Sequence, residues 1–115
     1  MSDAYDIEII DEVAVLHLRD AALMEFDSIQ STSSLIDKFI TESDTDKLVV
    51  DCGQIEFYNS LSLGLVVSKS AKARDLGKTL KYCNLNPQSM WAIQASRLHT
   101  ILDICYDLKQ ALDDF

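Results

Sequence analysis

Short runs of apolar residues along the chain predict five β-strands. Tyr5 to Ile10 alternates between apolar and polar residues, Val13 to Leu18 is a second β-rich run, and Asp11-Glu12 between them is typical of a tight turn. The first two strands are therefore expected to form a hairpin. Three later runs predict strands at 47–51, 79–83 and 101–105. The first of these is continuously apolar at its centre, as in strands that are buried on both faces of a sheet.

Helical spacing of apolar residues predicts the segments between these strands. A helix at 28–40 follows a polar loop, and a second helix at 60–76 is ended by a glycine. Asn86 and Pro87 are typical of the N-cap and the first position of a third helix, which is expected to run to about Leu98.

The last helix is expected to begin after Asp107, and Gln110 three residues later completes a capping-box pattern. The complete order is then β-β-α-β-α-β-α-β-α. Strands that alternate with helices are joined by right-handed crossovers. The predicted fold is therefore α/β, with a mostly parallel central sheet, an N-terminal hairpin and helices packed on the sheet.

The net charge of −9 over 115 residues limits the possible partners. Nucleic acid is not expected as a direct ligand, because phosphate binding needs a basic surface. Residues 1–68 carry 14 acidic and 3 basic side chains, whereas residues 69–115 carry 5 acidic and 7 basic ones. The acidic half either steers a basic protein partner or is a well-solvated surface that aids solubility. No apolar run approaches a membrane span and no signal-peptide pattern is present, so a soluble cytoplasmic protein is expected.

Residues that often carry chemistry are isolated in this sequence. The three cysteines match neither a zinc site nor a redox pair, and are expected to be buried free thiols in a reducing compartment: Cys52, Cys83 and Cys105. His17 and His99 are expected to have structural roles. Trp91 is expected to pack in the core or in a half-exposed position, and the alternative is a contact with a partner. There is no phosphate-binding loop, dinucleotide fingerprint or nucleophile elbow, so no enzyme class, metal or cofactor is predicted.

The start of the second predicted helix is the strongest candidate for a functional site. Asn59 and Ser60 lie where a strand passes into a helix, beside unpaired backbone N–H groups and the positive end of the helix dipole. A phosphate on Ser60 would be stabilised there and would add about −1.5 to −2 charges. The alternative is that Asn59 or Ser60 only caps the helix.

The faces of this helix, assigned at about 100° of rotation per residue, also indicate whether its start is a docking site. The side predicted to face the sheet consists of Leu63, Val66, Val67, Ser70 and Ala73. Leu61 and Leu65 then fall on the opposite side beside Ser60, and an exposed apolar pair suits a docking site. The alternative is that flanking loops cover the pair or that the first turn is rotated. The helix also carries a basic group, expected on a solvated face or against an acidic partner, made of Lys69, Lys72 and Arg74.

Three segments of the chain resemble the STAS domains of sulfate transporters and anti-sigma factor antagonists. The central segment is LVVDCGQIEFYNSLSLGLVV, which is similar to the family's strand, V-x-F-[IM]-D-S-[SA]-G-L-G segment and helix. RDLGKTLKYCNLNP resembles the next strand and its Asn-Pro helix start, and ILDICYDLKQALDDF resembles the closing strand and helix. The segments occur in the family's order and cover most of the chain, which implies one STAS-like domain over residues 1–115.

The resemblance implies a non-enzymatic partner switch of the bacterial anti-sigma factor antagonist type, which regulates transcription. Such proteins bind an anti-sigma factor, often a serine kinase, until phosphorylation of a serine blocks binding, and a phosphatase restores it. Ser60 matches that acceptor serine, whereas Asn59, Leu61 and Ser62 replace the family's Asp, Ser/Ala and Gly. Ser62 is a second hydroxyl and the alternative acceptor. The partner-binding residues are then expected to be Asn59, Ser60, Leu61, Ser62 and Leu65, with loops near 20–27 and 84–86.

Two other functions stay open. A STAS domain without the phosphorylation switch would be a scaffold or a subunit of a stress-signalling or transporter complex. The third possibility is a small-molecule binder for a nucleotide or lipid, although nothing beyond one helix N-terminus encodes a phosphate cradle. In each case no direct membrane insertion is expected, and the protein is expected to be a monomer or a weak dimer.

Overall fold

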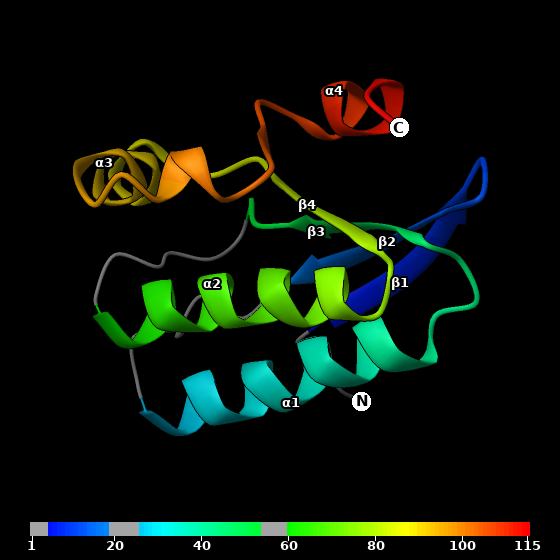
Figure 1. Cartoon of the computed structure of the whole chain (residues 1–115), viewed down its shortest axis with the longest axis horizontal. Coiled ribbons are helices and arrows are strands. Elements are labelled where there is room, and N and C mark those ends of the chain that lie inside the picture. The colour runs from blue at the N-terminus through cyan, green and yellow to red at the C-terminus, as the bar shows by residue number, and fades with distance from the viewer. Residues whose placement is uncertain (1–4, 19–25, 54–59) are drawn as a thin grey trace.

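A five-stranded mixed sheet forms the centre of the molecule (Figure 1). The computed structural model describes residues 5–18, 26–53 and 60–115, without the side chains of residues 26–29 and 60–62. The strands are β1 Tyr5–Ile10, β2 Val13–Leu18, β3 Lys47–Asp51, β4 Thr79–Cys83 and β5 Ile104–Cys105. The helices are α1 Phe26–Glu42, α2 Ser60–Asp75, α3 Pro87–Ala95 and α4 Leu108–Asp113, with a 3-10 turn at Leu98–Thr100. This is the predicted α/β architecture.

The strands lie in the order β1-β2-β3-β4-β5, and β1 pairs with β2 as the expected antiparallel hairpin. Asp11 and Glu12 connect the two strands with φ angles of 49° and 72°. Two consecutive positive φ angles are typical of the turn whose twist matches the right-handed twist of a hairpin. The pairs from β2 to β5 are all parallel, so the carboxyl ends of β2, β3 and β4 meet at one edge of the sheet.

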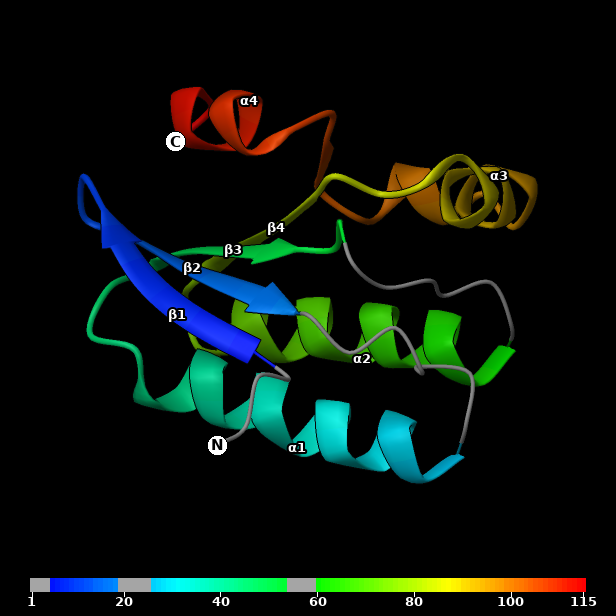
Figure 2. The same cartoon turned by 180° about the vertical axis from the view of Figure 1, so that it is seen from behind.

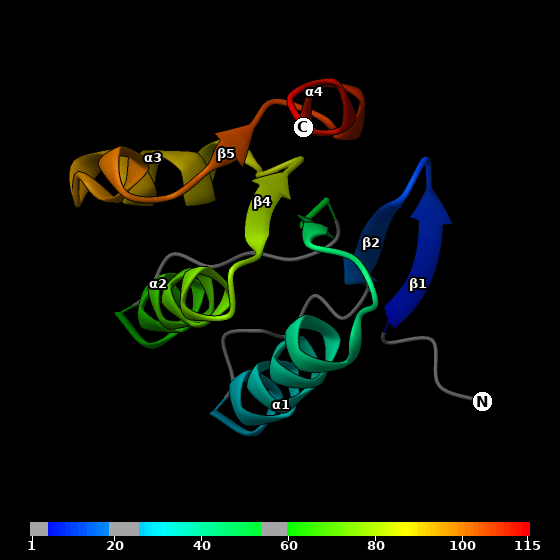
Figure 3. The same ribbon diagram turned by 45° about the vertical axis from the view of Figure 1, so that its right-hand side comes forward.

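Two apolar clusters hold helices on the two faces of the sheet. α1 and α2 lie side by side on one face, and α4 lies on the opposite face (Figure 3). The larger cluster joins β2, β3 and β4 to α1 and α2, and Ile93 of α3 also belongs to it. The smaller cluster contains Val15, Val49 and Cys83 from the sheet and Ala111 from α4. Among the described residues, no helix is both long and apolar enough to cross a membrane.

The third helix and the last strand are shorter than predicted. Asn86 caps α3 by accepting the Ser89 backbone N–H at 2.7 Å, as expected, but α3 ends at Ala95 instead of near Leu98. Arg97 has a φ of 61°, which takes the chain out of the helix and into the 3-10 turn. The backbone N–H of Leu102 bonds to the Leu98 carbonyl, so this residue still belongs to the turn and β5 starts only at Ile104.

The last helix has the predicted N-cap with one difference in detail. The Asp107 carboxylate accepts the Gln110 backbone N–H at 2.9 Å. The Gln110 side chain returns a bond to the backbone N–H of Tyr106, one residue earlier than the expected capping box requires. Both bonds satisfy donors at the start of a helix only six residues long.

Candidate functional site

The corner singled out by the sequence lies where β3 ends and α2 begins. α2 starts at Ser60, as predicted, and its backbone includes Leu61 and Ser62, whose side chains are outside the structural description. Asn59 and residues 20–25 of the loop that was expected beside this corner also lie outside the described residues. A helix of 16 residues directs its first N–H groups and the positive end of its dipole at this corner. The backbone at Ser60 is therefore suited to stabilise a negative charge.

Leu65 does not face solvent, so the expectation that it contributes to an exposed docking pair is wrong. Only 8% of its surface is exposed, and it belongs to the cluster that includes Ile36 and Ile40 of α1. The prediction treated the sheet as the neighbour of this helix. α2 instead has two neighbours, because α1 lies along its side while the Tyr82 hydroxyl of β4 donates to the Val66 carbonyl at 2.9 Å. Leu65 is therefore a packing residue.

Lys69 is buried as well, which corrects the expectation of a solvated basic group. It lies one turn after Leu65, with 6% of its surface exposed, and its Nζ lies 2.7 Å from Asp37 Oδ1 of α1. Lys72 Nζ lies 3.3 Å from the same oxygen. Burial alone raises the pKa of Asp37, but hydrogen bonds and charge from the two lysines lower it more, so the pKa lies below its usual value. These contacts join α1 to α2.

A chain of polar side chains crosses the same edge of the sheet. The two ring nitrogens of His17 lie 2.6 Å from Asp51 Oδ2 and 2.6 Å from Glu8 Oε1. The other Asp51 oxygen accepts bonds from the Asn84 side chain at 2.9 Å and the Gly53 backbone N–H at 3.0 Å. Strands β1, β2 and β3 and the end of β4 are thus connected. The network therefore holds the carboxyl end of β3, at Asp51 and Gly53, in place.

The ionisation of His17 and Asp51 follows from this network. Burial lowers the pKa of His17, but hydrogen bonds and charges from Asp51 and Glu8 raise it more, so the pKa lies above 6.5. Burial raises the pKa of Asp51, but bonds from Asn84, His17 and Gly53 lower it more, so the pKa lies below 3.8. At neutral pH these shifts favour an imidazolium between carboxylates. The geometry supports the structural role expected for His17.

This network was not among the predictions, although the sequence contains a signal for it. His17, Asp51 and Asn84 lie at or just after the ends of three β-rich runs. Parallel strands place their carboxyl ends at one edge of a sheet, so polar residues at these positions come together. Asn84 also belongs to the 84–86 loop expected beside the corner, and its contact with Asp51 places that loop there.

The structure also gives the burial of Trp91 and of the three cysteines. Trp91 is 71% exposed, so it does not pack in the core. The three cysteines are buried free thiols. Burial raises the pKa of Cys83 to about 12 and also raises the pKa of Cys52 and of Cys105 above its usual value. Within residues 5–18, 26–53 and 60–115, no group of His, Cys, Asp and Glu side chains is arranged to hold a metal ion.

Comparison with known proteins identifies the fold. No family model and no curated protein sequence matches the chain. An anti-sigma factor antagonist from Mycobacterium paratuberculosis has a similar structure, with a TM-score of 0.81 and 18% identity over 96% of this chain and 91% of that one. The phosphorylated Bacillus cell-fate determinant SpoIIAA has a TM-score of 0.66 and 17% identity over 96% and 98% of the two chains. A stressosome chain has a TM-score of 0.70 and 20% identity over 95% and 94%.

Each of these structural matches covers nearly the whole of this chain and nearly the whole of the matched chain. The protein therefore has the fold of the anti-sigma factor antagonists, the STAS fold that its sequence resembles. The identities are all 20% or less for these three structures, so the likeness is one of fold.

Proposed function

We propose that this protein is a non-enzymatic regulator of the anti-sigma factor antagonist type, formed by one STAS-like domain over residues 1–115. It binds an anti-sigma factor that is also a serine kinase. Phosphorylation of Ser60 blocks this binding, and a phosphatase restores it. The observation that carries the proposal is the position of Ser60 as the first residue of α2 in this fold. The similar fold of SpoIIAA, which is known in a phosphorylated form, supports it.

The physical basis of the switch is electrostatic. A phosphate adds about −1.5 to −2 charges and three acceptor oxygens, and the backbone N–H groups of the first turn of α2, which have no partner within the helix, would stabilise it. The same charge would lie in the docking surface that Asn59, Ser60, Leu61 and Ser62 form. An anti-sigma factor that packs apolar groups or acidic side chains there would then lose affinity. The burial of Leu65 confines the proposed surface to the first turn of α2 and the adjacent loops.

The proposal is tested first by mass spectrometry of the protein isolated from its native cells under growth and stress. Phosphate on Ser60 is expected. The kinase that copurifies should bind Ser60→Asp at least about tenfold more weakly than the wild type, a loss of about 1.4 kcal/mol. Ser60→Ala is the matched control and should bind as tightly as the wild type. Phosphate on Ser62 would move the acceptor by two residues, and Ser62→Asp would then show the loss.

A second function is favoured by a specific observation. Asn59, Leu61 and Ser62 depart from the pattern around the family's acceptor serine, and the fold also resembles a chain of the stressosome. A scaffold or subunit of a stress-signalling or transporter complex would use the same corner without a switch. Unmodified serines in every condition, with stable copurification of a large assembly that Ser60→Asp leaves intact, would replace the first proposal with this one.

A further inference from the structure

The hairpin strand β1 carries an apolar face that the described helices leave uncovered. Tyr5, Ile7 and Ile9 alternate onto one face and are 43%, 46% and 66% exposed. In the hairpin register Ile7 lies opposite Leu16 and Ile9 lies opposite Ala14, both of which are buried in the cluster beneath α1. α1 therefore covers β2 on this face and stops short of the edge strand β1 (Figure 2).

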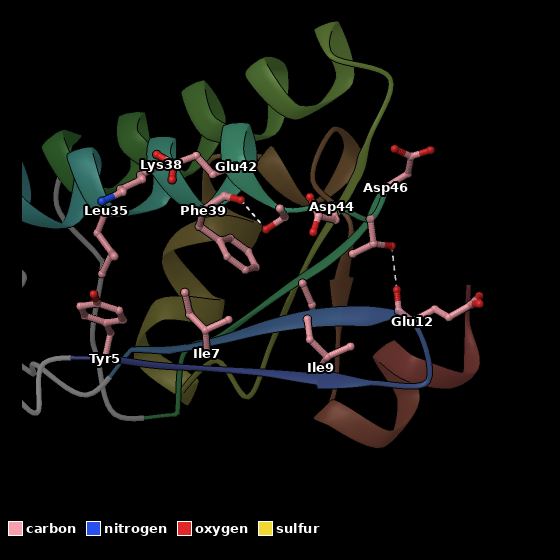
Figure 4. A pocket seen from close by; sticks show the side chains of 13 residues that line it. Tyr5, Ile7, Ile9, Glu12, Leu35, Lys38, Phe39, Glu42, Asp44 and Asp46 are labelled. Carbon is pink, nitrogen blue, oxygen red and sulfur yellow. Dashed lines mark hydrogen bonds between the residues drawn. The ribbon is translucent and has the colours of Figure 1, made fainter.

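The uncovered face and α1 enclose a groove of about 820 Å³. Ile7 and Ile9 point toward α1 from one side, and Leu35 and Phe39 point toward β1 from the other (Figure 4). Leu35 and Phe39 are four residues apart and so lie one above the other on the same helical face. These four side chains form the apolar floor of the groove. The groove has a strand on one side and a helix on the other, and it is open at the edge of the sheet.

One end of the groove is strongly acidic. Four carboxylates line it, at the hairpin turn, the last residue of α1 and the loop that follows: Glu12, Glu42, Asp44 and Asp46. Lys38 is the basic residue in the lining. The four carboxylates are exposed, and no ion pair among the described residues uses them. Lys78 Nζ donates to the carbonyls of Ile40 and Ser43 at the end of α1, at 2.7 and 2.9 Å, so the negative charge at this end of the groove comes from the four carboxylates and not from the helix dipole.

We propose that this groove is a second docking surface and that its occupant is a basic amphipathic helix of a protein partner. The apolar face of such a helix would cover Ile7, Ile9 and Leu35, and its lysines or arginines would meet the carboxylates at the acidic end. A helix suits the space because the groove lies against the face of the sheet, whereas an added strand would continue the sheet beyond β1. This inference goes beyond the proposed switch, because it concerns a different surface.

The acidic end lies far along the strands from the candidate switch. Glu12 and Asp46 directly precede β2 and β3, whereas α2 starts after the carboxyl end of β3. A second copy of this chain is a poor occupant, since the net charge of −9 would bring like charges to an already acidic rim. A partner bound in the groove would therefore leave the corner at Ser60 accessible.

The test uses a synthetic peptide of about 18 residues with leucines on one helical face and lysines on the other. It is titrated into the full-length, isotopically labelled protein while amide NMR spectra are recorded. Shifts are expected in β1 and α1. A peptide with glutamates in place of the lysines should not bind. Ile7→Lys with Ile9→Lys should weaken binding more than about tenfold, whereas Ile101→Lys with Tyr106→Lys, which adds the same charge at exposed apolar residues elsewhere, should change it less than about twofold.

A second pair of variants tests the charge without touching the apolar floor. Glu42→Gln with Asp44→Asn should weaken binding about threefold to tenfold and reduce its salt dependence, because two carboxylates leave the acidic end. Asp75→Asn with Asp113→Asn removes the same charge from exposed positions elsewhere and is the matched control. All four residues are exposed, so each variant is expected to keep the fold.

Three results would overturn the proposal. The lysine peptide could fail to bind, or its shifts could map outside β1 and α1. The control variants could lose as much affinity as the groove variants, which would indicate nonspecific attraction to an acidic protein. Finally, sedimentation could show that the wild type alone is a dimer that Ile7→Lys with Ile9→Lys converts to a monomer, which would make a second copy the occupant.

Discussion

His17 links β1 to β3 within the polar network at the carboxyl end of the sheet. It lies on β2, with Glu8 on β1 and Asp51 on β3 as its two carboxylate partners. The pKa of the imidazole is raised and that of Asp51 is lowered, so each group stabilises the charged form of the other. The contribution of Glu8 is the smaller one, because its side chain is 49% exposed to water.

The stability of the protein should therefore depend on pH through His17. Because its pKa is raised in the folded state, its contribution is complete below pH 6.5 and is lost as the pH rises through that raised value. The contribution of Asp51 is present above pH 3.8 and is lost as the pH falls through its lowered pKa. His17→Gln should lower the free energy of unfolding by about 1 kcal/mol at about pH 6 and by less at about pH 9.

Urea unfolding at the two pH values measures this difference. His99→Gln, at an exposed position, is the matched control for the loss of an imidazole, and the effect of His17→Gln is measured relative to it. An effect of His17→Gln that stays equal at both pH values would mean that the imidazole is not charged in the folded protein.

At the scale of elements, the contact between α1 and α2 decides the orientation of α2. Leu65 and Lys69 occupy the side of α2 that packs against α1, and Asp37 of α1 binds Lys69 and Lys72. The side chain of Lys69 is 7% exposed whereas that of Asp37 is 37% exposed. Lys69 therefore buries its aliphatic stem between the helices, while the carboxylate of Asp37 keeps contact with water.

Shortening this lysine should destabilise the protein chiefly through lost packing. Lys69→Ala is expected to lower the free energy of unfolding by about 1–2 kcal/mol, because Asp37 keeps both Lys72 and water as partners. Lys69→Met keeps the stem and should recover most of that loss. Urea unfolding is the measurement, and Lys109→Ala at an exposed position should stay within about 0.5 kcal/mol of the wild type. If Met is as destabilising as Ala, the ion pair matters more than the packing.

At the scale of the whole molecule, the sheet is covered unequally on its two faces. α1 and α2 cover one face with long helices, whereas on the other face a six-residue α4 packs on the smaller cluster. The three cysteines are distributed over the two apolar clusters, because Cys52 belongs to the larger cluster and Cys83 and Cys105 belong to the smaller one. Their labelling therefore tests whether the two faces open together.

All three thiols should be protected equally from an aromatic disulfide reagent near pH 8. The thiolate is the reactive form, and burial raises the pKa of each cysteine. Labelling is expected to require global unfolding, so its rate should rise with urea to the same degree at all three sites. Mass spectrometry of each labelled cysteine measures this, with the urea-unfolded protein as the fully reactive control. Faster labelling of Cys105 alone would show that α4 opens separately.

The sequence by itself determined the order, type and many ends of the elements, because these depend on local interactions. The bounds of Lys47–Asp51 and Thr79–Cys83 match the predicted strands, since a short apolar run between turns has few other conformations. Asn86 and Asp107 cap the helices that they were expected to cap, because a cap is a contact over three residues. Ser60 likewise starts α2 as predicted.

Only the tertiary structure decided which side chains meet across the chain. Leu65 and Lys69 are buried because α1 packs beside α2, and the helical period of α2 alone does not specify a second neighbour. His17 meets Asp51, 34 residues away, through the parallel register of β2 and β3. The groove exists because α1 covers β2 and leaves Ile7 and Ile9 uncovered. Local patterns specify elements, whereas the burial of a face depends on which other elements pack against it.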